Sequence, residues 1–519
     1  MITMKRSEMI PGRFSRLLVT LLVLPAVAPG PLLFGQEPAG TRSGSQSAPV
    51  SDSAGDLAER LRRIVEDPAL VRAHVGLAVQ IAETGEVLFE NEAEKRFVPA
   101  SNTKIVTAAV ALDALGPDHR WTTRLVVDGP VRDGVLAGDL WIVGGGDPLL
   151  SRSDLAGWVP LLREAGIRRI EGDLVGDDRV FEEGQWGEGW MWDDLFGGWA
   201  AGVSGLQLHP NTVRAWLIPG PELGDAARVV LRGVSPDLPI DNRVRTGAPG
   251  SEVRLQFLPP PEGGEVRLEG WVPVGPDSVP LYLSTPHPTL YLLDYLHEHL
   301  RDQGIAVTGG VRRARPTEQP ASPGWSVELR SEPLYEVIAD MLKPSDNQVA
   351  ETVLRTVGKE AGDGGSAESG IEVIEETLAG WGIEPGAVSL ADGSGLSRYN
   401  EVTPNAMVRL LRSMWRHPDF PVFEAAMPVA GVDGTLRRRL LGTPGESNVK
   451  AKTGSLSSVR ALSGYLRDGA GETLIFSLIL NGYDSPGDVA VALEDLLVEQ
   501  LALYRRPVAA GWPRFREMP

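Results

Sequence analysis

The chain of 519 residues contains no cysteine, only seven histidines, and no hydrophobic run long enough to span a bilayer comfortably. Without cysteine there can be no disulfide, thiol nucleophile, cysteine-bound metal or lipidated cysteine anchor. The histidines are scattered and His-Glu-x-x-His is absent, so the sequence supports neither a Ser-His-Asp triad nor a histidine metal site. The net charge of -19, with no basic stripe, argues against nucleic-acid and anionic-membrane partners.

What is present is the composition of a globular protein, with 42% hydrophobic and 23% charged residues, and a length that predicts two or three domains. Four basic residues precede an apolar run over 17–28, which ends in small residues. This pattern is typical of a secretory signal peptide. We therefore expect residues 1–35 to direct export to the periplasm or cell-wall space, with an uncleaved anchor as the alternative. A Gly/Ser/Pro-rich flexible linker over 36–55 follows.

In the rest of the chain the sequence pattern changes twice, near residue 121 and near residue 285. Short β-like runs between Gly/Pro-rich turns fill residues 121–284, which predicts an inserted, mainly β region of one or two small domains. Residues 56–120 and 285–519 combine helical periodicity with an early hairpin and three closing strands. The expected fold is therefore α/β: one β-lactamase/transpeptidase-like domain, an antiparallel sheet with helices, interrupted by the insertion.

The first chemical motif is Ser101-x-x-Lys104, at the start of an apolar helical run that Gly116 ends. Three residues make almost one helical turn, so the two side chains share a face. A serine among the free N–H groups of a helix start, with an amine one turn away, can act as a nucleophile with its own base. Taken alone, the motif has another explanation, because Ser101 could simply be a helix N-cap. The same Ser-x-x-Lys spacing also occurs at Ser447 and Lys450, so the spacing by itself is not specific.

Two further motifs follow in order. Ser345-x-Asn347 lies between two expected helices, and Lys452-Thr453-Gly454 lies on the first closing strand. Each is ordinary by itself. The ordered set Ser-x-x-Lys, Ser-x-Asn and Lys-Thr-Gly, with the first on a helix and the last on a strand, is typical of β-lactamases and penicillin-binding proteins.

These residue types suit acyl transfer. Ser101 would attack a carbonyl carbon to form an acyl-enzyme. Lys104 would accept its proton, provided that burial and the charge of Lys452 lower the lysine pKa. Ser345 would relay a proton to the leaving amine, and Asn347 would hold the substrate amide and Lys104.

The strand motif would bind the substrate backbone. The N–H groups of Ser101 and Ser455 would form the oxyanion hole. Gly454 would let the substrate lie close along the strand. Lys452, Thr453 and Ser455 would hold a terminal carboxylate. This chemistry requires neither a metal nor a cofactor.

With these motifs the chain resembles the low-molecular-mass class C penicillin-binding proteins, the serine-type D-alanyl-D-alanine carboxypeptidase/endopeptidases, over about residues 57–505. The long separation of Ser101 from Ser345 exceeds what a β-lactamase core needs, and this family carries a large insertion there. Further stretches that look like the family's own cover residues 144–148, 190–194, 206–211, 392–398 and 431–436.

The resemblance implies four more substrate-binding residues. Asp194 matches the acidic residue that holds the diaminopimelate ammonium in relatives, and Trp199 matches the aromatic residue that packs on that side chain. Arg398 and Ser457 match positions that contact the peptide. Asp193 could replace Asp194, and Trp199 and Arg398 could be structural instead.

The resemblance therefore implies a serine DD-peptidase that acts on peptidoglycan stem peptides, either removing the terminal D-Ala or cleaving D-Ala–diaminopimelate cross-links. β-Lactam antibiotics would be covalent inhibitors. A β-lactamase is one alternative, against which the insertion and the lack of an identifiable deacylating glutamate argue. A cell-wall-binding protein without activity is another, against which the complete motif set argues. Peripheral membrane association stays open, and the oligomeric state is not predicted.

Overall fold

The computed structural model describes the backbone of residues 2–5, 54–182, 184–232, 240–258, 266–275 and 277–506. The first four form the strand β1 (Ile2–Lys5), parallel to β19 (Pro323–Arg330) at the edge of a sheet. The rest of the expected signal peptide and almost all of the expected linker lie outside the described residues. No helix in the described part of the chain is both long and apolar enough to cross a membrane.

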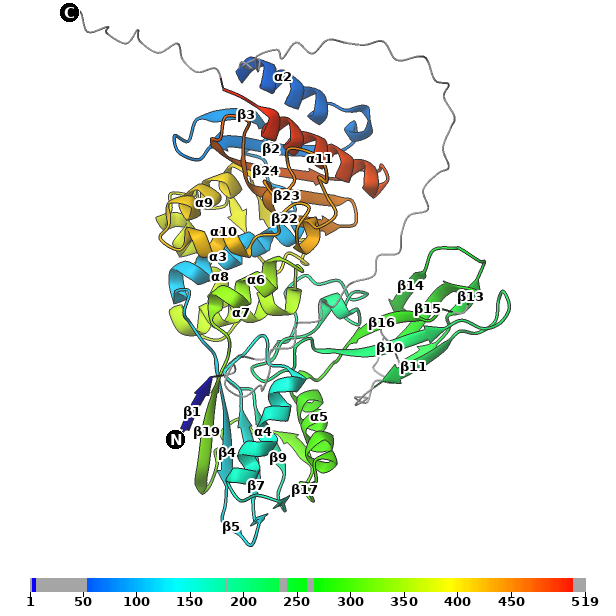
Figure 1. Cartoon of the computed structure of the whole chain (residues 1–519), viewed down its shortest axis with the longest axis vertical. Helices are drawn as coiled ribbons and strands as arrows, with labels where there is room; N and C mark the ends of the chain where they lie inside the picture. The colour runs from blue at the N-terminus through cyan, green and yellow to red at the C-terminus, as the bar shows by residue number, and fades with distance from the viewer. Residues whose placement is uncertain are drawn as a thin grey trace, which may run out of the picture.

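The upper part of the molecule contains a five-stranded antiparallel sheet in the order β22-β23-β24-β2-β3 (Figure 1). The hairpin β2 (His74–Ile81) and β3 (Val87–Asn91) comes from the start of the chain. The other strands, β22 (Lys450–Leu456), β23 (Val459–Arg467) and β24 (Thr473–Asn481), come from its end. Because β2 pairs with β24, both halves of the chain share one sheet. The predicted hairpin and closing strands are confirmed.

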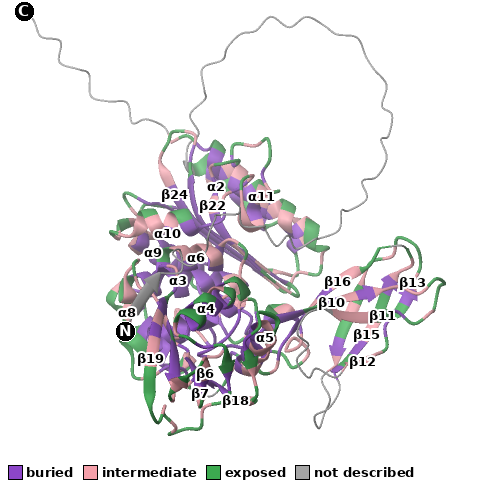
Figure 2. Cartoon of the chain, turned by 60° about the horizontal axis from the view of Figure 1, so that its bottom comes forward, coloured by how far each residue is buried: buried purple, intermediate pink, exposed green. Residues whose placement is uncertain are grey.

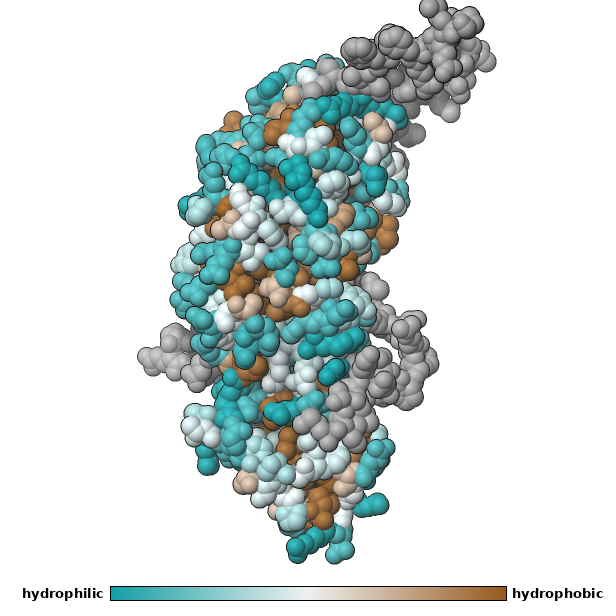
Figure 3. All heavy atoms as spheres, turned by 90° about the vertical axis from the view of Figure 1, so that its left-hand side faces the viewer, coloured by the Kyte–Doolittle hydropathy of each residue, from teal (hydrophilic) through white to brown (hydrophobic). Residues whose placement is uncertain are grey.

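Helices cover both faces of this sheet, and the buried residues follow the sheet and the helices around α3 (Figure 2). On one face lie α2 (Ala54–Val65) and α11 (Gly487–Leu503). The other face packs on a helical layer around α3 (Thr103–Leu115). The remaining helices of that layer are α6 (Leu334–Leu342), α7 (Asn347–Ala361), α8 (Ala367–Gly380), α9 (Pro404–Arg416) and α10 (Phe420–Ala426). On the side shown in Figure 3, hydrophilic residues cover most of the surface and hydrophobic ones form small separate groups.

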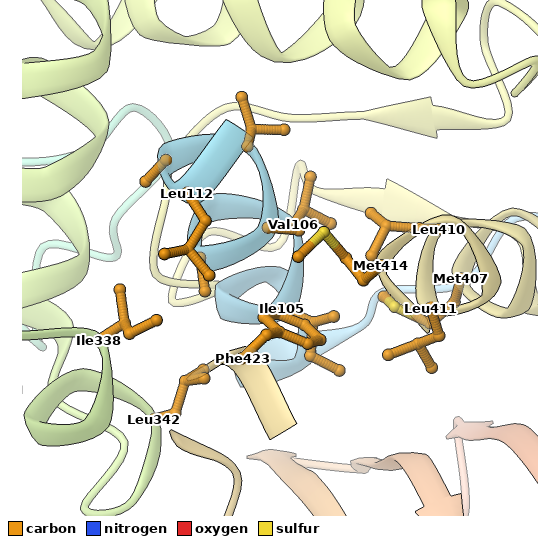
Figure 4. Packing of buried hydrophobic residues seen from close by; sticks show 14 of the residues in the cluster. Ile105, Val106, Leu112, Ile338, Leu342, Met407, Leu410, Leu411, Met414 and Phe423 are labelled. Carbon is orange, nitrogen blue, oxygen red and sulfur yellow. The ribbon is translucent and has the colours of Figure 1, made fainter. Parts of the chain in front are cut away.

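Helix α3 is the central helix of this layer, which explains why its sequence is apolar nearly all round. Ile105 and Val106 lie among side chains of α9 and α10, including Met414 and Phe423, while Leu112 faces α6 (Figure 4). Full burial of an aliphatic side chain of this size contributes about 1.5–3 kcal/mol. The run of buried side chains therefore fixes α3 firmly, and with it the residues at its N-terminus.

The chain between α3 and α6 forms two further bodies, one below the core domain and one to its right (Figure 1). The first is a six-stranded sheet in the order β1-β19-β4-β7-β9-β18, with α4 (Arg152–Glu164) and α5 (Pro288–Asp302) packed on it. Its other strands are β4 (Thr122–Asp128), β7 (Asp139–Val143), β9 (Leu174–Asp177) and β18 (Val311–Arg313). A small sheet of β5 (Val131–Arg132), β6 (Val135–Leu136), β8 (Arg169–Ile170) and β17 (Ala306–Val307) adjoins it.

The second body has its own hydrophobic core between two small sheets. One sheet contains β10 (Thr212–Ile218), β11 (Arg228–Arg232) and β16 (Val279–Ser284). The other contains β12 (Ile240–Asn242), β13 (Arg245–Gly247), β14 (Arg254–Leu258) and β15 (Val266–Pro273). Each of the two bodies thus has a hydrophobic core of its own, and the described residues Val126, Trp141 and Val175 form a further small cluster in the first body.

The insertion also ends later than predicted. Strand β19 pairs with β4, and Leu292 and Leu296 of α5 share a core with Leu125 of β4. The boundary predicted at residue 284 is therefore wrong, because the core domain resumes only at α6, after Arg330. Helical periodicity had correctly indicated a buried face on α5, but periodicity does not reveal which core that face joins.

Candidate active site

Ser101 and Lys104 meet at the start of the central helix. Ser101 lies on the short 3₁₀ turn η2 (Ala100–Asn102), directly before α3, and the fully buried Lys104 is in the first turn of α3. The Lys104 Nζ donates to the Ser101 Oγ at 3.1 Å. The structure thus brings together the pair that the first motif predicted.

The Lys104 ammonium has two further acceptors. It donates to the Asn347 Oδ1 at 2.5 Å and to the carbonyl oxygen of Ser394 at 2.6 Å. Burial lowers the pKa of Lys104 to about 8, against the charges of nearby carboxylates, of which Asp392 has the largest effect. An amine with this pKa is partly neutral near neutral pH and can accept a proton.

Lys452 is held in the same way beside the second motif. Its Nζ donates to the Ser345 Oγ at 2.8 Å and to the Thr453 carbonyl oxygen at 2.7 Å. Burial, followed by the charge of Lys104, lowers the Lys452 pKa well below its ordinary value. The charge of Lys104 thus acts on Lys452. Burial is what lowers the Lys104 pKa, and the expected contribution of Lys452 to that shift stays a prediction. Ser345 has a φ of 67°, a left-handed turn that connects α6 to α7.

The inserted region contacts the Ser-x-Asn motif directly. Asp346 caps α7 by accepting from the Val349 N–H at 3.0 Å, and its second oxygen lies 2.9 Å from the His209 Nε2. The Asn347 Nδ2 donates to the Trp199 carbonyl oxygen at 2.8 Å. Sequence reasoning gave His209 no role, although it lies in one of the family-like stretches. Its contact pairs two residues 137 positions apart, which no local pattern reveals.

A fully buried carboxylate organises the loop that holds Lys104. Asp392 accepts five hydrogen bonds of 2.5–3.1 Å, which satisfy a charge that would be costly to bury alone. The donors are Trp190 Nε1, Ser394 Oγ, the N–H groups of Gly395 and Ser397, and Asn400 Nδ2. The sequence analysis did not single out Asp392, and the glycine- and serine-rich run after it was the available signal.

Glu351 supports the same loop from α7. Its Oε1 accepts from the Gly393 N–H at 2.9 Å and its Oε2 lies 3.3 Å from Arg355. Burial, followed by the charge of Asp392, raises the Glu351 pKa to about 7. The Glu351 side chain therefore stabilises the loop that contains Gly393 and Ser394, behind Lys104.

Strand β22 carries the third motif at one edge of the sheet, where an extended peptide can lie alongside it. A Cβ on Gly454 would come within 2.6 Å of the Pro99 carbonyl oxygen, so the glycine is needed for the contact between β22 and the Ser101 segment. This reason differs from the predicted one, which was the approach of the substrate. Ser455 is exposed and accepts from Arg460 at 3.2 Å.

The residues implied for side-chain binding also gather here. The Trp199 Nε1 donates to the Asp194 Oδ1 at 3.0 Å, and Trp199 is half exposed instead of being a core residue. Arg398 donates to the Ser457 carbonyl oxygen at 3.0 Å. Burial raises the Asp194 pKa, and the charge of Arg398 acts against that shift. The four residues therefore frame one region beside the motif strand.

An antiparallel sheet backed by helices, with a serine and a buried lysine at the start of the central helix, defines the class of serine acyl-transfer enzymes. The particular family follows from comparison: the profile of the D-Ala-D-Ala carboxypeptidase 3 (S13) family matches residues 57–500. The chain belongs to this family.

Individual relatives agree with this assignment. The chain is 33% identical over 509 residues to a D-alanyl-D-alanine carboxypeptidase of Actinomadura sp. (strain R39), which covers 95% of this chain and 91% of that protein. It is 28% identical over 421 residues to D-alanyl-D-alanine carboxypeptidase DacB of Haemophilus influenzae, with 80% and 87% covered. The crystal structure of penicillin binding protein 4 (dacB) from H. influenzae superimposes with a TM-score of 0.73 at 28% identity, covering 87% of this chain and 99% of that one.

The buried lysine predicts a pH dependence. Because only neutral Lys104 can accept a proton and its pKa is about 8, the rate of acylation by benzylpenicillin should rise with pH and level off above pH 8. Below pH 8 it should fall by about tenfold per pH unit. Lys104→Arg, which stays charged, should abolish acylation, while Lys359→Ala on the exposed side of α7 should leave the profile unchanged. Stopped-flow acylation at several pH values measures this, and a flat profile would contradict the role of Lys104.

The loop behind Lys104 gives a second prediction. Gly395 has a φ of +83°, and a Cβ there would lie 1.8 Å from the Ala100 carbonyl oxygen, next to the nucleophile. Gly395→Ala should therefore lower the free energy of unfolding by about 2 kcal/mol or more and slow acylation at least about tenfold. Gly380→Ala, at the end of α8 with open space around its Cβ, is the matched control. Wild-type melting and acylation for Gly395→Ala would refute this.

Proposed function

We propose that this protein hydrolyses the D-Ala-D-Ala bond, or D-Ala–diaminopimelate cross-links, of peptidoglycan stem peptides through an acyl-enzyme on Ser101, and that penicillin acylates the same serine. The observation that carries the proposal is the Lys104 ammonium, whose Nζ reaches both the Ser101 Oγ and the Asn347 Oδ1. One buried lysine thus links the nucleophile to the residue that would hold the substrate amide.

In the first step, neutral Lys104 takes the proton of the Ser101 hydroxyl while Oγ bonds to the carbonyl carbon of the penultimate D-Ala. The N–H groups of Ser101 and Ser455 stabilise the resulting oxyanion. When the C–N bond breaks, the proton taken up by Lys104 passes through Ser345, whose Oγ is hydrogen-bonded to Lys452, to the leaving amine, and Lys104 is neutral again. Water then attacks the ester carbonyl while Lys104 accepts its proton. That proton goes to the Ser101 Oγ as the ester C–O bond breaks, which restores the hydroxyl and releases the shortened peptide with a free carboxyl group.

Substrate binding uses the edge strand and the inserted region. Lys452, Thr453 and Ser455 hold the terminal carboxylate. Thr453 is positioned by its hydroxyl contact of 2.8 Å with Thr435. Asp194 holds the diaminopimelate ammonium, with Trp199 packed on that side chain. An anionic group beside an aromatic face is a suitable site for such a cation.

Slow deacylation by water distinguishes this proposal from β-lactamase activity. A β-lactamase needs a group that activates water against the penicilloyl ester. Both oxygens of the buried Glu351 are engaged by Gly393 and Arg355, which supports a long-lived adduct. The structure of the H. influenzae penicillin binding protein 4 in complex with a β-lactam, at a TM-score of 0.70 and 26% identity, supports binding of the same drug class.

Intact-mass spectrometry after incubation with benzylpenicillin tests the nucleophile. The wild-type chain should gain one penicilloyl group and keep it, and Ser101→Ala should gain none. Ser447→Ala, which alters the second Ser-x-x-Lys pair, should behave as wild type. Rapid penicillin turnover without an adduct would favour a β-lactamase, and an adduct on Ser101→Ala would exclude Ser101 as the nucleophile.

We also propose that the chain is exported across the cytoplasmic membrane and loses its first residues near position 35. The support is the basic and then apolar order of the N-terminal sequence. The mass of the protein recovered from the periplasmic or secreted fraction should correspond to a chain that begins near residue 36. Recovery of the full-length mass from that fraction would point to an uncleaved anchor.

A further inference from the structure

Exposed aromatic side chains are unevenly distributed over this protein. Burying large apolar side chains is favourable, so an exposed group of them usually marks a binding surface. Six tryptophan or tyrosine residues are exposed among the described residues, and four of these lie on two segments, 186–199, which contains Asp194, and 392–399. The four, with their exposed fractions, are Trp186 (37%), Trp192 (57%), Trp199 (51%) and Tyr399 (65%).

The two segments are fastened to each other beneath these side chains. The Trp190 Nε1 donates to the buried Asp392 at 2.9 Å, and Trp190 packs with Leu396 in a small hydrophobic cluster. A Cβ on Gly189 would lie 2.6 Å from a ring carbon of Tyr399, so the Tyr399 ring lies against the backbone of the first segment. These contacts hold the backbones of the two segments in place relative to each other, and with them the exposed aromatic side chains.

The two segments lie next to the proposed substrate site. Trp192 lies inside the turn closed by the hydrogen bond from the Asp194 N–H to the Met191 carbonyl oxygen, at 2.9 Å. Tyr399 directly follows Arg398, whose charge acts on Asp194. Trp192 and Tyr399 are thus exposed beside the proposed Asp194 site, one on each segment.

We propose that Trp192 and Tyr399 bind the glycan of peptidoglycan, by stacking on the ring faces of the N-acetylated sugars that carry the stem peptide. The inference rests on the proposed function. A pyranose ring has an apolar C–H face and a polar rim, which matches an aromatic ring with a polar edge. Within the described part of the chain, no side-chain hydrogen bond engages the Trp192 indole N–H or the Tyr399 hydroxyl, so both polar edges can bond to sugar hydroxyls.

Exposed tryptophans can also bind a lipid surface, which is the alternative ligand here. The net charge of -19 opposes approach to an anionic membrane. The continuity of Trp192 and Tyr399 with the substrate site, whose natural ligand is covalently attached to sugar, favours the glycan.

The direct test measures binding of peptide-free glycan chains to the Ser101→Ala protein, through tryptophan fluorescence or calorimetry. Trp192→Ala and Tyr399→Ala, each in that background, should weaken binding by about 3- to 10-fold, and Trp192→Phe should retain most of it. Trp271→Ala is the matched control, because Trp271 is 43% exposed but lies on β15 in the second inserted body. This readout needs no catalysis, so it stands even if the proposed hydrolysis fails.

A second measurement uses the active chain. We expect kcat/KM to be higher for a pentapeptide carried on its disaccharide than for the free pentapeptide, and this preference should disappear in Trp192→Ala. Hydrolysis of the free peptide and acylation by penicillin should not change. Unaltered glycan affinity and preference in both alanine variants would overturn the inference. So would binding to phosphatidylcholine vesicles that is lost in Trp192→Ala while glycan affinity is unaltered.

Discussion

The buried ammonium of Lys104 is the interaction on which the arrangement of the site depends. Removing this cation from water is costly unless hydrogen bonds and nearby negative charge compensate. One of its three oxygen partners, Ser101, lies one helical turn before it. The other two come from distant parts of the chain: Asn347 at the start of α7, and Ser394 in the loop after β20 (Val388–Ser389). Each partner is held by its own support. The helical layer fixes Ser101, the α7 cap fixes Asn347, and the hydrogen bonds to Asp392 fix the Ser394 loop.

Hydrogen bonds also connect the insertion to the proposed catalytic residue Asn347 and to nearby residues of the core domain. Residues Gln207 and His209 of the insertion bond to Thr352 and Asp346 of the core domain, and the Trp199 carbonyl oxygen binds the side chain of Asn347. The Asn347 amide, which we propose also holds the substrate, contacts Lys104 through its oxygen and the Trp199 carbonyl oxygen through its nitrogen, so its orientation is fixed from two sides. The core domain supplies one side through α7, and the insertion supplies the other.

The sequence predicted the parts whose signals are local. The α3 run, the early hairpin and the closing strands follow from periodicity, and the three motifs from their order along the chain. Other features depend on pairings between distant segments. In the sequence, Asp392 is an ordinary aspartate in a glycine-rich run. Its role is visible only in the structure, where Trp190, 202 positions away, donates a hydrogen bond to it. Likewise, α5 has a clear buried face, yet only the pairing of β19 with β4 shows that this stretch still belongs to the insertion. The roles of the site residues remain predictions, now with a geometry that supports them.

The pairing of β2 with β24 also has a consequence for the order of events during biogenesis. The segment with Ser101 is made early, but the strand that completes its sheet and the motif strand beside it are made last. Such contacts between distant segments form only after the intervening chain is available. A chain whose synthesis is unfinished therefore has Ser101 without the edge strand that carries Lys452 and Ser455. If these residues act as proposed, the enzyme cannot form an acyl-enzyme until its last strands have folded.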